Sequence, residues 1–429
     1  TNPVTLNGGT LRTGGGQSTT RNTWAASVTV TTNSTVQSDG GTIGNLFTGG
    51  LNMGNSSYTL SIGGNGNNSG SANNFNSVIS GGPNATILVN SVGLAYLNAA
   101  NTYSGTIRSG WSLVLQNANA LQNATLDMNA ADNGSVTLVN NAVIGALTGS
   151  RNLNLSVSSV FIGNNGTSST YSGALTNSGS LTKIGFGTFT LTGTNTYTGR
   201  TTINNGTLAL SGGGSLASQN IIVAGGATFD VSGKTTPFAL GSSSTLTNSS
   251  VGAVINGANN CSAGILSLVT DGVNPSFIQT NGTMTLSAGT VITVNNTGAM
   301  LAPGSHPLIM AATNSNLGRV TGALPSVVVT GNGAVGVGSL QINGSGGLDL
   351  VVSSTLSNNP ISIGFTFSSG TLTLTWPGDH LGWIAQSNLL NVGNSNSWFD
   401  ILGSQSTTNL IMPLNPATPQ VFYRLRYPF

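Results

Sequence analysis

Charge is the property that this 429-residue chain has least of, because only 4% of its residues are Asp, Glu, Lys or Arg. An average soluble protein carries about 25%. Every acidic residue is an Asp, Glu is absent, and lysine occurs only at Lys183 and Lys234. Glu and Lys favour helices, whereas the 62 glycines weaken them. The composition therefore argues against helices and predicts an all-β chain.

The net charge is equally small, at +2. The arginines are scattered, with one close pair at Arg424 and Arg426, so the chain has no basic stripe of the kind that binds nucleic acid. We therefore expect no nucleic-acid partner. A nearly neutral surface repels its own copies only weakly, which leaves self-association little opposed.

Cysteine occurs once, at Cys261, so the chain can form no internal disulfide. Two interpretations stay open for this residue: a small buried apolar side chain, or half of an intermolecular disulfide. No apolar run reaches the roughly 20 residues that a membrane-spanning helix needs. The sequence therefore predicts no membrane-spanning segment.

Clustered acids are also missing, and paired carboxylates are the usual minimum for glycoside hydrolysis. The nearest approach to a pair is Asp127 and Asp132, for which solvated turn positions are the simpler interpretation. Asp379 beside His380 has no second His or Cys close in sequence that would complete a metal site, and His306 lies in a loop next to proline. We predict no catalytic, cofactor or metal site and no enzyme activity.

Short β-type runs cut by glycine are what the chain contains instead, most clearly over residues 179–210. Residues 188–192 read Thr-Phe-Thr-Leu-Thr, the two-residue alternation of a strand with one buried face. The pentapeptide Asn-Thr-Tyr-Ser-Gly recurs as Asn-Thr-Tyr-Thr-Gly, and we single out its positions Asn101, Tyr103, Gly105, Asn195, Tyr197 and Gly199. A recurring strand-turn unit indicates a solenoid, in which each unit buries its face by stacking on the next.

Two long copies of this pattern occupy about 42–105 and 143–210. The Ile-Gly-Gly-Asn-Gly of residues 62–66 in the first copy matches the Ile-Gly-Asn-Asn-Gly of residues 162–166 in the second. Each copy divides into units of roughly 20–25 residues, the size expected for one turn of a β-solenoid. We therefore predict a β-solenoid over residues 1–357.

The composition changes after a break at Asn-Asn-Pro, residues 358–360. Three of the five tryptophans, Trp376, Trp383 and Trp398, fall beyond it, among several short runs of β-type residues. We predict a small antiparallel β-sandwich over residues 361–429. The three tryptophans are candidate glycan or partner contacts, with the packed core of the sandwich as the alternative.

Residues 179–210 resemble the autotransporter-associated β-strand repeat of secreted bacterial passenger proteins. The matching residues are Leu181-Thr182-Lys183, Gly185, Gly187-Thr188, Leu191, Gly193, Asn195–Gly199, Thr201-Thr202-Ile203 and Gly206-Thr207-Leu208. The resemblance implies a right-handed parallel β-helix that is secreted to the surface or surroundings of a bacterium. It does not specify chemistry, because such passengers include adhesins, enzymes and inert stalks. The tail, from residue 372 to 425, resembles the C-terminal module of repeat-rich secreted proteins of Verrucomicrobia-like bacteria.

Together these patterns predict a structural extracellular β-solenoid, either a cell-surface stalk or the subunit of a head-to-tail fibre. Exposed strand edges at the two ends of a solenoid are the places where copies would join. An adhesin or glycan-binding surface protein is the alternative, and a polysaccharide-degrading β-helix enzyme is a weaker one. The expected partners are further copies of the chain or surface glycans, and no cofactor is expected.

Overall fold

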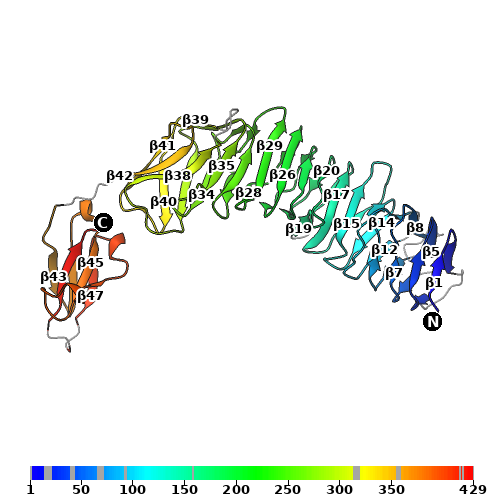
Figure 1. Ribbon diagram of the computed structural model, residues 1–429, viewed down its shortest axis with the longest axis horizontal. Helices are drawn as coiled ribbons and strands as arrows, with labels where there is room; N and C mark the ends of the chain where they lie inside the picture. The colour runs from blue at the N-terminus through cyan, green and yellow to red at the C-terminus, as the bar shows by residue number, and fades with distance from the viewer. Residues whose placement is uncertain are drawn as a thin grey trace.

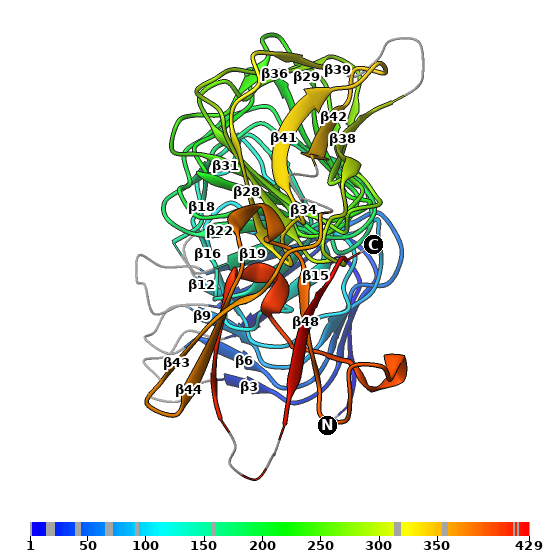
Figure 2. The same cartoon turned by 90° about the vertical axis from the view of Figure 1, so that its left-hand side faces the viewer.

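The chain folds into an elongated stack of β-strands that ends in a separate pair of small sheets (Figure 1). The computed structural model describes residues 2–13, 22–38, 44–64, 72–90, 94–156, 159–312, 319–353, 359–414, 417 and 420–428. The N-terminus lies at one end of the stack and the tail sheets lie at the other (Figure 1). Figure 2, which looks from the tail end, shows successive turns lying behind one another.

One parallel ladder runs along nearly the whole stack. Its strands follow in the order β2 (Thr10–Thr13), β5 (Ser34–Ser38), β8 (Thr59–Gly64), β11 (Thr86–Val89), β13 (Thr106–Ser109), β15 (Leu121–Met128), β17 (Ala142–Gly149), β20 (Ser169–Tyr171), β23 (Thr188–Leu191), β26 (Thr207–Gly212), β29 (Thr228–Lys234), β32 (Ala253–Asn256), β35 (Phe277–Thr280) and β38 (Gly304–Ala311). Each strand pairs with the strand one turn earlier and the strand one turn later, which is the defining geometry of a parallel β-solenoid.

A second parallel ladder branches from β15 and β17. It continues through β19 (Ser159–Ile162), β22 (Ser180–Lys183), β25 (Thr201–Ile203), β28 (Asn220–Val223), β31 (Thr245–Asn248), β34 (Ile265–Thr270), β37 (Val291–Asn296) and β40 (Val327–Gly331). This branching gives the middle of the solenoid two long sheet faces.

Shorter parallel sheets complete the cross-section of the turns. They comprise β3 (Asn22–Trp24), β6 (Asn45–Phe47), β9 (Ala72–Phe75), β12 (Leu94–Leu97), β14 (Ser112–Leu115) and β16 (Val136–Thr137); β1 (Val4–Leu6), β4 (Val28–Val30), β7 (Leu51–Asn52) and β10 (Ile79–Ser80); β18 (Leu153–Asn154) with β21 (Leu175–Thr176); β24 (Thr194–Asn195) with β27 (Ser215–Leu216); and β30 (Phe238–Ala239), β33 (Asn259–Asn260), β36 (Thr283–Leu286) and β39 (Arg319–Gly322).

The apolar side chains of successive turns stack in register, which explains why the alternating sequence folds this way. In the first ladder Phe189, Leu208 and Phe229 are consecutive register partners, and all three are buried. Near the N-terminus Phe47 stacks on Phe75 with ring centroids 4.8 Å apart and Trp24 lies on its other side. Because each turn covers the apolar face of its neighbours, the core is a continuous column along the axis.

The C-terminal end of the first ladder is closed by a hairpin rather than by another parallel turn. Strand β42 (Leu348–Ser353) pairs antiparallel with β38 on one side and with β41 (Val337–Ile342) on the other. The hairpin covers the edge that β38 would otherwise expose. An antiparallel end cap of this kind is not visible in the alternation pattern of the sequence.

The tail consists of two three-stranded antiparallel sheets. One contains β43 (Gly364–Ser368), β44 (Thr371–Thr375) and β47 (Asn409–Pro413), and the other β46 (Phe399–Asp400), β45 (Ile384–Asn388) and β48 (Phe422–Arg426), with the 3-10 turns η1 (Gly378–His380), η2 (Ser395–Ser397) and η3 (Ser404–Ser406) between strands. Side chains of both sheets pack around Leu374, Trp376 and Ala385. A second small cluster packs Trp383 and Tyr427 of the tail against Met300 and Val335 of the solenoid.

The predicted fold class is confirmed: the chain is all-β, with a parallel β-solenoid followed by small antiparallel sheets. Of the paired motifs in the two long copies, Ile162–Gly166 lies at the end of β19 and in the turn that follows it. In the earlier copy, Asn65 and Gly66 lie outside the described residues.

Candidate functional site

The repeated asparagines, Asn101 and Asn195, are buried, and each side chain joins three consecutive turns. The Asn101 side chain accepts a hydrogen bond from the Ile79 N–H (2.8 Å) and donates one to the Ala120 carbonyl (3.0 Å). Asn195 accepts from the Leu175 N–H (2.9 Å) and donates to the Ser215 carbonyl (3.0 Å). Each side-chain amide therefore replaces a backbone link of the ladder where the chain turns.

The repeated tyrosines, Tyr103 and Tyr197, are also buried, and each hydroxyl has a hydrogen-bond partner. Tyr103 donates to the carbonyls of Ala85 (2.5 Å) and Thr106 (3.0 Å), whereas the Tyr197 hydroxyl lies 2.6 Å from the Thr201 hydroxyl. Burial raises the pKa of both phenols well above the usual range. Neutral, hydrogen-bonded phenols in a core are structural anchors rather than catalytic acids.

The repeated glycines, Gly105 and Gly199, are required by close approach of the chain to the previous turn. A Cβ at Gly105 would lie 2.3 Å from both the Ala85 carbonyl oxygen and the Tyr103 hydroxyl. A Cβ at Gly199 would lie 2.2 Å from the Gly179 carbonyl oxygen. Glycine therefore lets two turns pack at backbone distance.

A third copy of the tyrosine–glycine motif, which the sequence analysis missed, lies at Tyr171 and Gly173. The Tyr171 hydroxyl donates to the Arg151 carbonyl, and a Cβ at Gly173 would lie 2.6 Å from that hydroxyl. The signal that could have revealed it is the sequence Ser-Thr-Tyr-Ser-Gly over residues 169–173, which differs from the first motif only at its first residue.

Lys183 is the second feature that sequence reasoning missed, because lysine is rarely buried. It lies in β22 with its side chain inside the solenoid, and its ammonium donates to the carbonyls of Ile184 (2.7 Å), Gly185 (2.8 Å) and Asn205 (3.2 Å). Burial lowers the pKa of Lys183 to about 8. The three carbonyls satisfy all three N–H donors of the ammonium, so this lysine joins β22 to the turn around Asn205 through backbone oxygens.

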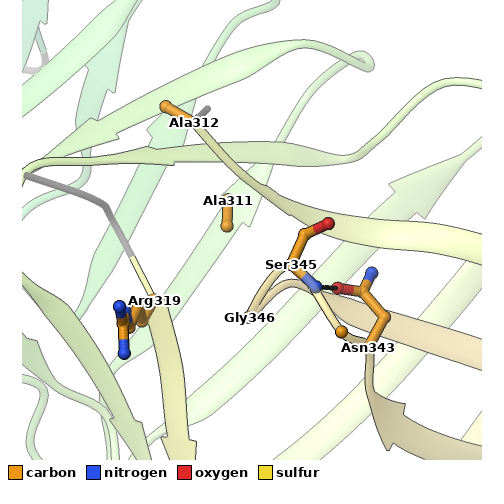
Figure 3. Close-up of a pocket in the computed structure, with 7 residues that line it drawn as sticks. Ala311, Ala312, Arg319, Asn343, Ser345 and Gly346 are labelled. Atoms are coloured by element: carbon orange, nitrogen blue, oxygen red, sulfur yellow. Dashed lines mark hydrogen bonds between the residues drawn. The ribbon is translucent and has the colours of Figure 1, made fainter. Parts of the chain in front are cut away.

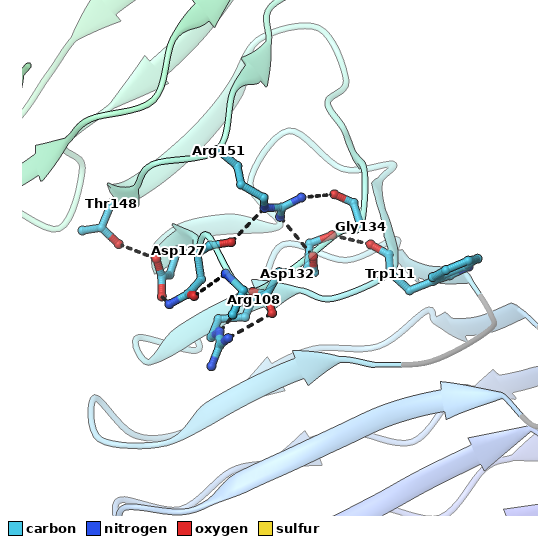
Figure 4. Close-up of polar contacts among 10 residues, drawn as sticks. Arg108, Trp111, Asp127, Asp132, Gly134, Thr148 and Arg151 are labelled. Carbon is cyan, nitrogen blue, oxygen red and sulfur yellow. Dashed lines mark hydrogen bonds and ion pairs between the residues drawn. The ribbon is translucent and has the colours of Figure 1, made fainter. Parts of the chain in front are cut away.

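The two acids considered from the sequence, Asp127 and Asp132, each form hydrogen bonds with other side chains of the solenoid (Figure 4). Arg108 holds Asp132 through two hydrogen bonds, Nε to Oδ2 at 3.1 Å and Nη2 to Oδ1 at 2.9 Å. Asp127 instead accepts from Asn129 and, at 3.4 Å, from Thr148. Asp132 is therefore a buried carboxylate paired with an arginine.

Neighbouring Arg151 fixes the same loop from the other side (Figure 4). Its guanidinium donates to the backbone carbonyls of Asn129 and Gly134 in this loop and of Ser109 at the end of β13. The two arginines therefore stabilise the loop 129–134, and the arrangement offers hydrogen bonds to the protein itself rather than to a ligand.

The two histidines lie at the C-terminal end of the solenoid and in the tail. Both ring nitrogens of His306 face backbone carbonyls, those of Gly272 (2.9 Å) and Ala302 (2.8 Å). His380 is buried with Nδ1 2.8 Å from the Asp379 carboxylate and Nε2 3.0 Å from the Asn359 carbonyl. Burial by itself would lower the pKa of His380, but the bonds to Asn359 and Asp379 outweigh it and raise that pKa.

The tail tryptophans do not form a single exposed platform. Trp376 is 5% exposed inside the sandwich, and Trp383 is 7% exposed beside His380 and Tyr427. Trp398 is half-buried, and the Arg424 guanidinium stacks over its ring at 4.2 Å. Only Trp398 therefore retains accessible ring surface of the kind that a sugar or a partner side chain would contact.

Cys261 is fully buried, its Sγ lies 3.4 Å from the Asn259 side-chain oxygen, and burial raises the pKa of its thiol to about 12. Of its two interpretations, the structure supports the small buried side chain. A protonated, inaccessible thiol reacts slowly, because the thiolate is the reactive form.

A shallow pocket of about 440 Å³ lies between the end of β38, the start of β39 and the turn that joins β41 to β42 (Figure 3). Arg319 is its one charged lining residue, and the Asn343 side-chain oxygen already accepts from the N–H groups of Ser345 and Gly347. A second pocket, lined by residues 216–219 and 238–244 with Ile221, carries no charged side chain. Neither pocket brings acid–base groups together.

Metal and membrane features are limited in the part of the chain that the structure describes. Within the described ranges, no group of three or more His, Cys, Asp or Glu side chains lies close enough to hold a metal ion. Among the same residues, no helix has the length and apolar character needed to cross a membrane.

Comparison with known proteins agrees with this geometry. The passenger-associated-transport-repeat family model matches residues 181–210, the segment from β22 to β26 that contains Lys183, Asn195, Tyr197 and Gly199. No curated protein and no solved structure matches the chain. The parallel β-solenoid and this match together fit an autotransporter-associated β-helix repeat protein. The match is to a repeat of passenger-type structural domains.

Proposed function

We propose that the protein is a structural extracellular rod, exported to the bacterial cell surface, where it acts as a stalk. The observation that carries this proposal is the unbroken parallel ladder from β2 to β38. A continuous ladder spans a long distance with one chain, and its stiffness comes from pairing between every turn and the next. Export is supported by the passenger transport repeat at 181–210.

The buried polar side chains support a structural role more than a binding role. Four of them direct their polar groups inward and donate hydrogen bonds to backbone carbonyls of neighbouring turns: Asn101, Tyr103, Lys183 and Asn195. In this proposal residues 1–357 form the rod and residues 361–429 form a terminal module.

Assembly into a head-to-tail fibre is a finer version of the same proposal. Among the described strands, β1, β2 and β3 each pair on one side only, with β4, β5 and β6. An unpaired parallel edge can form hydrogen bonds with a strand of another chain. If the N-terminal end of one copy binds the C-terminal end of the next, and the copies do not close into a ring, a filament results. At the other end, the β41–β42 hairpin and the tail would have to receive that edge.

Electron microscopy of the purified full chain over a range of concentrations tests both versions. A stalk predicts thin rods with a small body at one end that are not joined through the N-terminal end of the ladder at any concentration. The fibre version predicts rods joined end to end, and a variant with Thr5→Pro in β1 should shorten them because proline removes an edge N–H donor. Compact particles without an elongated body would contradict the proposal as a whole.

An adhesin is the second candidate, supported by the accessible Trp398–Arg424 pair in the tail. A glycan array probed with the wild-type chain and with Trp398→Ala tests it, with Trp24→Ala in the solenoid as the control for general damage. Binding that is lost only in the tail variant favours an adhesin, whereas no binding by the wild type argues against glycans as partners.

A further inference from the structure

Exposed apolar side chains gather in the tail. Among the described residues, ten of the eighteen exposed large apolar side chains belong to it: Phe365, Phe367, Leu381, Leu389, Leu390, Val392, Phe399, Leu402, Ile411 and Leu414. The tail is less than a fifth of the chain, so its surface differs from the polar surface of the solenoid. Contiguous apolar surface on a soluble protein commonly marks an interaction site.

Strand β43 is the most exposed element of this surface. All five of its residues are exposed, and Phe365 and Phe367 are 73% and 62% exposed. Among the described strands β43 pairs only with β44, so its other backbone edge is unpaired. The strand therefore offers both free hydrogen-bonding groups and two aromatic rings.

The two rings project from the face of the sheet that forms the sandwich core. Phe365 is the register partner of Leu374, and Phe367 is the register partner of Leu372. Directly opposed residues of an antiparallel pair lie on the same face. Leu374 is buried under the second sheet, whereas the two phenylalanines one strand further out are not. The sandwich thus leaves its edge strand uncovered.

Natural edge strands are usually protected by charges, proline or a bulge, which prevent pairing with other chains. Strand β43 reads Gly-Phe-Thr-Phe-Ser and has none of these, and its pairing with β44 runs without a register shift. Strands β43, β44 and β47 together carry no charged residue. Nothing in the sheet opposes the approach of a second strand.

We propose that β43 pairs antiparallel with β43 of a second copy, which makes a two-fold dimer through the tails. The strand is symmetric about Thr366, so a two-fold pairing centred there places Phe365 of each copy opposite Phe367 of the other. The two sheets then become one continuous sheet, and the four aromatic rings cover one another. A pairing between identical edges closes on itself and leaves neither edge free.

A second copy fits this edge better than an unlike partner, because the strand is complementary to itself. The two-fold axis places Phe365 of one copy opposite Phe367 of the other, so aromatic rings meet aromatic rings. The strand has no charge that would favour a partner of opposite charge. The net charge of +2 on the whole chain adds little repulsion between copies.

Sedimentation of the full chain over a concentration range provides the first test. The wild type should change from monomer to dimer, and Phe365→Ser combined with Phe367→Ser should remain monomeric. Ile411→Ser is the matched control, because Ile411 is 69% exposed in the same sheet but lies on β47, outside the proposed contact. A wild type that is monomeric throughout, or a dimer that survives the double substitution, would overturn the proposal.

Cysteine crosslinking tests the register itself. Two copies of Thr366→Cys would face each other at about 4.5–5.5 Å between Cα atoms, within disulfide range, so mild oxidation should yield covalent dimers. Ser368→Cys is the control, because in this register two copies of it lie about 13 Å apart, too far to bridge. Crosslinking of Ser368→Cys but not of Thr366→Cys would refute the proposed pairing.

The dimer uses the free edge of β43, whereas the stalk proposal rests on the parallel ladder from β2 to β38, so either of these two proposals can fail without the other. Rods seen as single particles with no tail-to-tail pairs would leave the stalk intact and contradict the dimer.

Discussion

Lys183 and Ile203 are register partners on consecutive turns, so a lysine occupies a place in a ladder that is otherwise apolar. Ile162 lies on its other side, one turn earlier. Its ammonium donates to three backbone carbonyls, and no carboxylate of the described residues pairs with it. The family match over residues 181–210 includes this lysine. In this chain the matched repeat therefore contains a buried lysine that joins two turns through backbone carbonyls.

The first prediction concerns this lysine and pH. Its pKa is lowered by burial from 10.5 to about 8, so between these values the unfolded chain binds more protons than the folded chain. The free energy of unfolding should therefore rise with pH from about 8, with a slope of up to about 1.4 kcal/mol per pH unit. Urea unfolding between pH 7.5 and 9 measures this slope.

Lys183→Met should remove the rise, and Lys234→Met should keep it. The measurement stops at pH 9 because burial raises the pKa of Cys261 from 9.0 to about 12. Above pH 9 this thiol makes the free energy of unfolding fall with pH, which would oppose the effect of Lys183. Equal slopes in the wild type and Lys183→Met would show that the lysine is not titrating as a buried group.

The second prediction concerns Asn195. Replacing this buried residue by Ala removes the acceptor for the Leu175 N–H and the donor for the Gly193 and Ser215 carbonyls. Unsatisfied buried groups cost about 1–3 kcal/mol each, so Asn195→Ala should lower the free energy of unfolding by at least about 2 kcal/mol. Asn204→Ala, at an exposed position nearby, should change it by less than about 0.5 kcal/mol. A similar loss of unfolding free energy in both variants would contradict the role of Asn195 in joining the turns.

The third prediction concerns Gly105. An alanine there would place its Cβ 2.3 Å from the Ala85 carbonyl oxygen and from the Tyr103 hydroxyl, so two turns would have to separate. Overpacking of this kind typically costs about 1–3 kcal/mol, measured as a lower urea midpoint. Gly213→Ala is the control, because no atom lies within 4 Å of its added Cβ. A neutral Gly105→Ala would mean that the turns have room to move.

The fourth prediction concerns His380 at the junction of the solenoid and the tail. Its pKa is raised above 6.5, mainly because Asn359 and Asp379 accept hydrogen bonds from both ring nitrogens against the opposing effect of burial. A raised folded pKa contributes stability that is fully present below pH 6.5 and is lost as pH rises through the folded value. The tail should therefore become less stable across that range.

NMR titration of the histidine ring signals measures this pKa directly, because the chain has only two histidines. Asp379→Asn should shift the His380 titration to lower pH and weaken the pH dependence of tail unfolding. A His380 signal that titrates at or below 6.5 in the wild type would contradict the double hydrogen bond.

Local patterns in the sequence were enough to predict the solenoid and its inward side chains. Thr-Phe-Thr-Leu-Thr over 188–192 gives a buried face at Phe189 and Leu191 because successive side chains of a strand alternate sides. The recurrence of Asn-Thr-Tyr indicated stacked units, because a short unit of this kind covers its apolar face only with its neighbours. The tail tryptophans stayed ambiguous, since exposed and packed aromatics look alike in sequence.

Contacts between turns were decided only by the tertiary structure. Whether Lys183 is solvated or buried, and whether Asp132 meets Asp127 or Arg108, depends on which residues of adjacent turns come into register. The hairpin that ends the ladder at β38 and the open edge of β43 likewise depend on pairing partners far along the chain. That strands form and stack can be predicted from alternation alone, because alternation is a property of neighbouring residues. The register of the turns depends on residues about 20 or more positions apart, so it is fixed only in the folded chain. This register decides which buried polar groups meet and which strand edges stay free.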